Sequence, residues 1–197
     1  MLFTVFRWFR RLVYLVVLVL FVYLVVTSAQ VVVASRSPLA FAQVKPAAAI
    51  VVIGSATRAT PLTADLKLRC QEAVSLYRAK RAAKVITTAD PSVESYLRAH
   101  GIRHLSLVPA SDIPGQLSAA RRLLPSSAGA KVIIVADPLQ TKWLQELATA
   151  EHLHAQIAAV PEPKGSFWHD VGTIWGQAVA VGLGRFVGYE NTGWIGG

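Results

Sequence analysis

Apolar and polar positions divide this chain into a long apolar N-terminal segment and a larger region in which short apolar runs alternate with amphipathic stretches. The N-terminal run is unbroken from Leu12 to Val26 and continues with few polar residues to Ala34. Read as one helix, residues 12–34 rise about 35 Å at ~1.5 Å per residue, which is enough to cross a bilayer core. The pattern therefore predicts a transmembrane helix over 12–34.

The charges beside this segment give the predicted helix a direction. Arg7, Arg10 and Arg11 precede the apolar run, and no acidic residue occurs before Asp65. By the positive-inside rule, residues 1–11 stay in the cytoplasm. Everything after residue 35 then faces outward, so the localisation expected is a single-pass protein of the cell membrane.

A cleaved signal peptide is the alternative interpretation of the same segment. Small residues at 27–29 and 32–34 would both serve as cleavage sites. The apolar run is longer than a typical signal-peptide core, and Trp8, Tyr14 and Tyr23 resemble anchoring aromatic residues. These features favour a retained anchor.

From Ala49 onward, short apolar runs alternate with helical periodicities. The runs predict five strands, at 49–54, 84–88, 105–108, 131–136 and 156–160. Helices are predicted at 61–81, between Asp90 and Gly101, at 113–124, from Asp137 onward, and at 167–187. Strands and helices in this order predict a parallel sheet covered on both faces, a doubly wound, Rossmann-like three-layer α/β sandwich.

This pattern also divides the outward-facing part of the chain. Residues 35–46 are expected to form a linker, 47–187 the α/β domain, and 188–197 a Gly-rich tail. The last helix, 167–187, contains charged residues and four glycines, with a fifth directly after it, so we expect it to pack on the sheet and not to span the membrane. Its aromatic residues, Trp175 among them, would place it near the bilayer.

The composition shows a surplus of basic over acidic residues and a single cysteine. Three N-terminal arginines account for a third of the formal charge of +9, so the remainder carries +6. Outside the membrane the partners expected are anionic lipid head groups or cell-wall polymers, and nucleic acid is not expected. Basic residues from Arg78 to Lys84 are interpreted as complementing a helix C-terminus. Cys70 permits no internal disulfide and is expected to be a small buried hydrophobe.

Candidate binding groups follow the strands, because ligands of doubly wound sheets bind beyond the carboxyl ends of the strands. Asp90 and Asp137 also precede prolines at helix starts, where plain helix capping is the alternative role. Arg58, together with the hydroxyls of the loop 54–60, would suit an anion. The candidate ligand-binding residues are Gly54, Ser55, Arg58, Arg69, Asp90 and Asp137, with Glu94 and Asp137 as candidate catalytic groups.

The sequence lacks the motifs of nucleotide-binding, metal-binding and serine-hydrolase sites. The loop 54–60 has one glycine, so it is neither a dinucleotide fingerprint nor a phosphate loop, and no cofactor is expected. The histidines have no metal-ligand spacing, and no metal is expected. A Ser55–His169–Asp137 triad would lack the G-x-S-x-G turn around its serine.

A series of short motifs gives the chain a resemblance to a known family. An apolar strand ends at 54–56, a Glu-containing helix precedes Gly101, and an Ala-Asp-Pro motif occupies 136–138. With these motifs, residues 47–187 resemble the YdcF/SanA/ElyC family of bacterial envelope proteins. The resemblance implies an outward-facing Rossmann-like domain linked to envelope barrier function and to peptidoglycan or lipid-carrier metabolism. The pocket it implies consists of Gly54, Ser55, Arg69, Glu94 and Asp137.

Several positions depart from this family's pattern. Its Gly-Gly after the second strand is Ala89-Asp90, its Thr-x-Glu-Asn signature is replaced by residues 114–117, and the His after its Asp-Pro is Gln140. The implied pocket is therefore depleted, which favours binding or scaffolding in cell-envelope homeostasis over strong catalysis. One alternative is an enzyme acting on a lipid-linked phosphate or a peptidoglycan precursor, with Glu94 or Asp137 as acid/base and Arg58 or Arg69 as anion clamp. Another is an accessory subunit of a membrane protein complex.

Overall fold

The computed structural model describes residues 2–35, 41–54, 62–109, 112–125, 129–160 and 167–188. The first elements are α1 (Leu2–Ser35), a short 3-10 helix η1 (Phe41–Gln43), β1 (Ala49–Val52), α2 (Ala64–Arg78), β2 (Val85–Thr88), α3 (Pro91–Ala99) and β3 (Leu105–Val108). They are followed by α4 (Ile113–Arg122), β4 (Ala130–Ala136), a 3-10 helix η2 (Pro138–Gln140), α5 (Thr141–Ala150), β5 (Leu153–Ala159) and α6 (Phe167–Val187).

The five strands form one parallel sheet in the order β3-β2-β1-β4-β5. Central β1 is buried at all four positions, as its continuous apolar sequence requires. The chain runs outward from β1 to β3 and then crosses back to β4 on the other side of β1. This order confirms the predicted doubly wound α/β fold and places the topological switch point between the ends of β1 and β4.

Helices cover both faces of the sheet. On one face, Ile50 and Val52 of β1 pack with α2 and α3. On the other, Val51 and Ile53 share a core with α4 and α5, in which Trp143 is fully buried. This alternation of β1 side chains between the two layers follows from the two-residue period of a strand.

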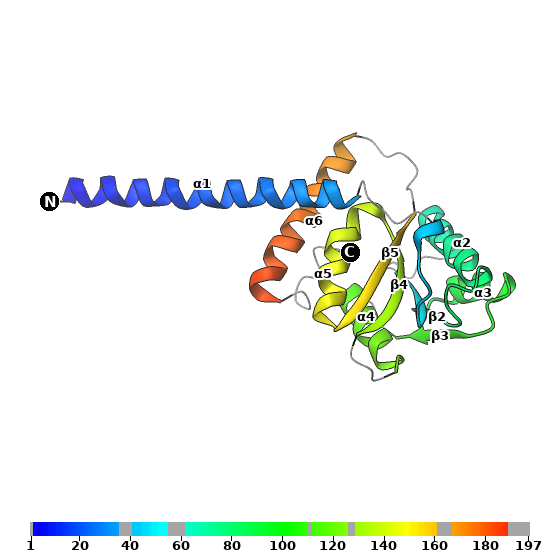
Figure 1. Ribbon diagram of the computed structural model, residues 1–197. Helices are drawn as coiled ribbons and strands as arrows, with labels where there is room; N and C mark the ends of the chain where they lie inside the picture. The colour runs from blue at the N-terminus through cyan, green and yellow to red at the C-terminus, as the bar shows by residue number, and fades with distance from the viewer. Residues whose placement is uncertain are drawn as a thin grey trace.

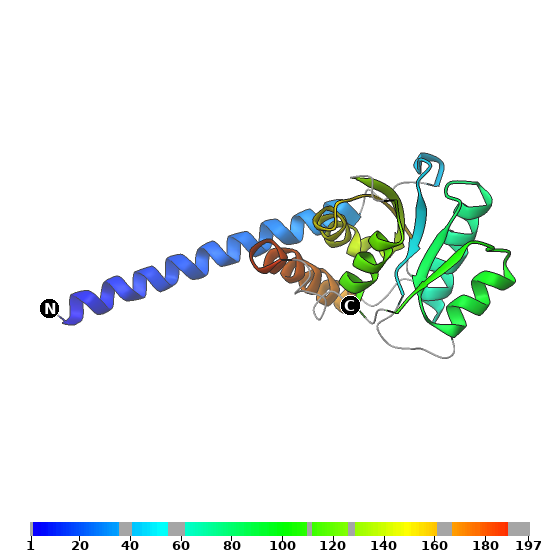
Figure 2. The same cartoon turned by 90° about the horizontal axis from the view of Figure 1, so that it is seen from below.

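Helix α1 projects from the α/β body as one long helix, and α6 crosses it at the edge of the body from which it projects (Figures 1 and 2). Among the described residues, the segment Arg7–Ser35 of α1 is long and apolar enough to cross a membrane. Its side chains are exposed from Arg7 to Val22, whereas Thr27 and Val31 are buried against the body. The last turns of α1 are therefore part of the domain's packing.

The structure refines three predicted boundaries. The helix expected from Asp137 begins as the 3-10 turn η2 before α5 starts at Thr141. β5 starts at Leu153, ahead of the predicted residue 156, because its full length pairs with β4. The described part of the expected linker 35–46 lies against this strand: the Lys45 N–H donates to Gln156 Oε1 at 2.8 Å, and Gln156 Nε2 donates to the Lys45 carbonyl at 3.2 Å.

Candidate functional site

Gly54 lies two residues beyond the end of β1, at the switch point, and is in close contact with the end of β2. A Cβ atom built on Gly54 would overlap the Thr88 hydroxyl oxygen. The Gly54 N–H donates to Gln116 Oε1 at 3.1 Å, in a buried position. Close packing thus accounts for glycine at this position.

Gln116 is a further polar group at the switch point. From sequence it was noted only as part of a departure from the family signature. It lies on α4 and is 1% exposed, and its Nε2 has no hydrogen-bond partner among the described residues. Its place on the apolar stripe with Ile113, Leu117 and Ala120 was the available signal. A buried amide on such a stripe requires a specific partner, because a buried donor without one costs free energy.

Arg69 and Asp90 lie close to Cys70 on the α2 side of the sheet. Burial raises the pKa of the Cys70 thiol to about 12, with Arg69 lowering it and Asp90 raising it further. Arg69 Nη1 also donates to the Ile53 carbonyl at 3.2 Å, at the end of β1. The fully buried thiol is therefore protonated at neutral pH, which confirms that Cys70 is a packing residue.

The two aspartates that follow β2 and β4 both cap helices. Asp90 Oδ1 accepts hydrogen bonds from the Ser92 N–H at 2.8 Å and from the Ser92 hydroxyl at 2.6 Å. Asp137 Oδ1 accepts from the Leu139 N–H at 2.6 Å. Both carboxylates are buried, so the capping role considered in the sequence analysis is present at both positions.

Glu94 points to a different partner. Its Oε1 lies 2.8 Å from Arg98 Nε, one turn along the surface of α3. Ser55 and Arg58, like the side chain of His169, lie outside the described residues. The structure thus groups Gly54, Arg69 and Asp90 around the ends of β1 and β2, while Asp137 follows β4 and Glu94 pairs on its own helix. In the part of the chain that the structure describes, no three His, Cys, Asp or Glu residues cluster as metal ligands do.

A hollow lies at the opposite, amino-terminal end of the sheet. Two adjoining cavities of about 680 and 500 Å³ share Ala83 and His104 as lining residues. We call them together the basic groove, and their basic lining residues are Arg78, Lys80, Lys84, His100, Arg103 and His104.

In the described part of the chain, no carboxylate neutralises the cations of the basic groove. Arg78 Nη2 donates to the His100 carbonyl and Lys84 Nζ to the Leu123 carbonyl, both at 3.2 Å. Among the described residues, neither of them, nor Lys80 or Arg103, lies within ion-pair distance of a carboxylate. Arg78 and Lys84 thus bond carbonyls at the C-terminal ends of α3 and α4, not at the end of their own neighbouring helix α2, where the helix-end role was expected. These bonds leave their positive charges available to an anion.

No known protein-family model, curated protein or solved structure matches this chain. The resemblance to the YdcF/SanA/ElyC family therefore rests on its short motifs alone. Function has to be argued from the arrangement of the residues themselves.

Proposed function

We propose that this chain is a single-pass membrane-anchored protein that contributes to cell-envelope homeostasis by binding an anionic envelope component. Helix α1 would be retained in the membrane with Arg7, Arg10 and Arg11 on the cytoplasmic side. The α/β domain would then face outward, as in the family that the sequence resembles.

The observation that carries the binding role is the basic groove, whose arginines and lysines lack carboxylate partners among the described residues. Phosphate-bearing polymers and lipid head groups are the anions that such a surface would meet outside a cell membrane. At the other end of the sheet, Asp90 and Asp137 are committed to helix caps and Glu94 to Arg98. That commitment favours binding over acid–base catalysis.

The test measures binding of linear polyphosphate to the full chain in phosphatidylcholine nanodiscs. We expect the double variant Arg78→Glu/Arg103→Glu to bind roughly thirtyfold more weakly, since each basic residue contributes about 1 kcal/mol to holding an anionic surface. Lys67→Glu is the matched control, because Lys67 is an exposed cation of α2 outside the groove. Because the control reverses one charge and the test variant reverses two, a loss of about fivefold in the control would mean diffuse charge attraction and would contradict the proposal. Competition by phosphatidylglycerol vesicles separates a lipid source of the phosphate from a polymer source.

Gln116 favours a second candidate function, an enzyme acting at the carboxyl ends of the strands. Its unpartnered buried Nε2 beside Gly54 would suit a ligand carbonyl or phosphate oxygen, with Glu94 or Asp137 as the acid/base. A strain lacking the protein, scored for envelope sensitivity, separates the two functions. Rescue by Glu94→Gln/Asp137→Asn but not by Arg78→Glu/Arg103→Glu supports binding, and the reverse supports catalysis.

A further inference from the structure

Helix α6 presents an apolar stripe that the α/β body leaves exposed. Trp175 is 44% exposed and Leu183 is 40% exposed, with half-buried Val179 between them at spacings of four residues. The opposite side of α6 is buried, through residues such as Ala178 and Val181. Two large apolar side chains on one face of a helix are therefore only partly covered by the described residues.

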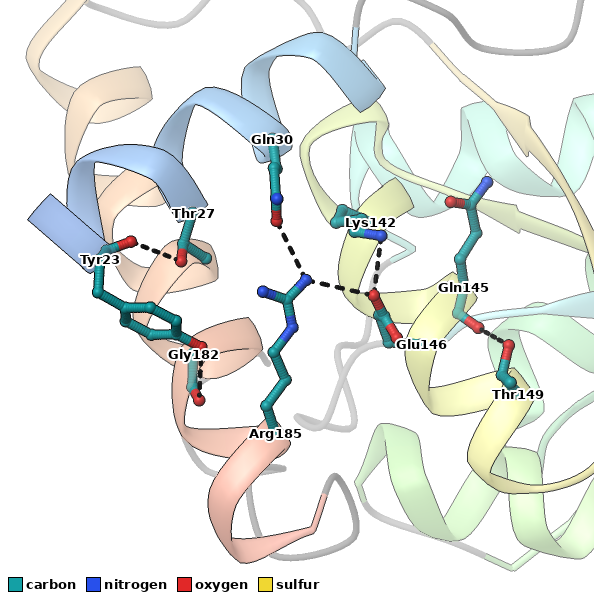
Figure 3. Close-up of polar contacts among 9 residues, drawn as sticks. All are labelled: Tyr23, Thr27, Gln30, Lys142, Gln145, Glu146, Thr149, Gly182 and Arg185. Atoms are coloured by element: carbon teal, nitrogen blue, oxygen red, sulfur yellow. Dashed lines mark hydrogen bonds and ion pairs between the residues drawn. The ribbon is translucent and has the colours of Figure 1, made fainter.

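This stripe lies beside the helix predicted to cross the membrane. Figures 1 and 2 both place α6 across α1 at the edge of the body from which the exposed part of α1 projects. The Tyr23 hydroxyl donates to the Gly182 carbonyl at 3.4 Å, next to Leu183 in the chain. Arg185 Nη2 donates to Gln30 Oε1 at 3.0 Å (Figure 3). The end of α6 is thus fixed to α1 between Tyr23 and Gln30.

The length of α1 fixes the depth of these contacts. Between Arg11 and the first contact at Tyr23, residues 12–22 rise only about 16 Å, roughly half of a bilayer core of ~30 Å. A full crossing that leaves the arginines at the cytoplasmic interface therefore also uses residues beyond Tyr23. Those residues are the ones that contact α6. Tyr23, which contacts Gly182, rises about 18 Å from Arg11, and Gln30, which contacts Arg185, rises about 28 Å. The end of α6 therefore extends from the outer interface into the outer leaflet.

We propose that α6 is an interfacial helix that buries Trp175 and Leu183 in the outer leaflet of the bilayer crossed by α1. The occupant of the stripe is the boundary between lipid head groups and acyl chains, where tryptophan is favoured and where an arginine such as Arg185 can stay at head-group level. The inference rests on the proposed membrane anchoring of α1. In this arrangement two helices, α1 and α6, hold the domain against the membrane surface.

Depth-dependent fluorescence in the full-length chain tests this arrangement. Single variants Trp175→Cys and Leu183→Cys are labelled with nitrobenzoxadiazole and reconstituted into phosphatidylcholine vesicles, with or without lipid carrying a nitroxide at the fifth acyl carbon. Wild type is the labelling blank, because Cys70 is fully buried. Leu123→Cys on the end of α4 is the matched control at 41% exposure, and Val16→Cys reports whether α1 itself is in the bilayer.

We expect blue-shifted emission and severalfold stronger nitroxide quenching at positions 175 and 183 than at position 123. If position 16 is quenched but position 183 is as exposed to water as position 123, the inference is overturned and the anchoring proposal stands. A blue shift at 183 without nitroxide quenching means a protein contact, such as a second copy of the chain, and also overturns it. No quenching at position 16 contradicts the anchoring proposal itself.

Discussion

Single positions at the switch point show how tightly the ends of β1 and β2 are packed. Gly54→Ala would force a methyl group against the Thr88 hydroxyl, which is buried and has little room to move. Overpacking of this kind costs about 1–3 kcal/mol. We expect the free energy of unfolding, measured by urea denaturation in detergent, to fall by that amount.

Two further variants separate this contact from a general effect of losing a glycine. Thr88→Ala removes the atoms that the new methyl group would meet, so the double variant should recover part of the loss. Gly176 of α6 has open space around the position that a Cβ would take, with no atom within 4 Å, and Gly176→Ala should leave the helix unchanged or stabilise it by up to ~1 kcal/mol. Equal losses at both glycines would contradict the packing argument.

Asp137 allows the capping role to be distinguished from an acid–base role. Its side chain accepts the Leu139 N–H, and asparagine caps as well as aspartate does. Asp137→Asn should therefore keep wild-type stability, whereas Asp137→Ala should lose about 0.5–2 kcal/mol in the same denaturation experiment. If Asn destabilised the chain as much as Ala, the negative charge and not the cap would be the stabilising feature.

At the scale of elements, a polar network joins α1, α5 and α6. Glu146 Oε1 lies 2.8 Å from Lys142 Nζ and 3.4 Å from Arg185 Nη2, and Arg185 also bonds Gln30 of α1 (Figure 3). Burial alone would raise the pKa of Glu146, but the hydrogen bonds and charges of Lys142 and Arg185 outweigh it and lower that pKa below its ordinary 4.5. The network therefore stabilises the folded state through the ionised carboxylate.

This lowered pKa predicts acid sensitivity at the junction of the three helices. The stabilisation is complete above the ordinary pKa of 4.5 and is lost as the pH falls from there through the lowered value. We expect wild type to lose stability more steeply below pH 4.5 than Glu146→Gln does, in denaturation curves measured from pH 7 to pH 3. Glu72 is a control of opposite sign, since burial raises its pKa: Glu72→Gln should gain stability over wild type as the pH rises above 4.5.

The elements themselves were largely predictable, because apolar periodicity reports burial. The pattern predicted β3 and α6 to the residue and the rest to within a few residues. It placed β5 late because His154 interrupts the apolar run on this edge strand. The bond between Gln116 and Gly54, and the shared lining of the basic groove, were beyond local pattern, since each depends on contacts between distant segments. Which carboxylates lie close together likewise depends on the topology. In this structure Glu94 pairs with Arg98, and Asp137 accepts the Leu139 N–H.

At the scale of the whole molecule, α1 is continuous from its exposed apolar part into its contacts with the domain. Side chains from Arg7 to Val22 are exposed all round, so that part of α1 has no fixed rotational orientation relative to the body. Beyond Tyr23 the register matters, because Tyr23 contacts Gly182 while Val31 is buried in the domain core. One inserted residue turns everything before it by about 100° relative to everything after it.

Two insertions of one alanine, equal in composition, therefore test whether the anchor and the domain form a single unit. Inserted after Val19, the alanine leaves every contact of α1 with the domain in place, and we expect the Tm in detergent to be unchanged. Inserted after Val26, it rotates Tyr23 away from Gly182 while Val31 stays docked. Loss of that partly buried hydrogen bond and its packing is worth about 1 kcal/mol, which lowers the Tm by roughly 2–4 °C in a protein of this size. Equal Tm values for the two insertions would mean that α1 is joined to the domain by a passive tether, and the seating of α6 on the membrane would lose its geometric basis.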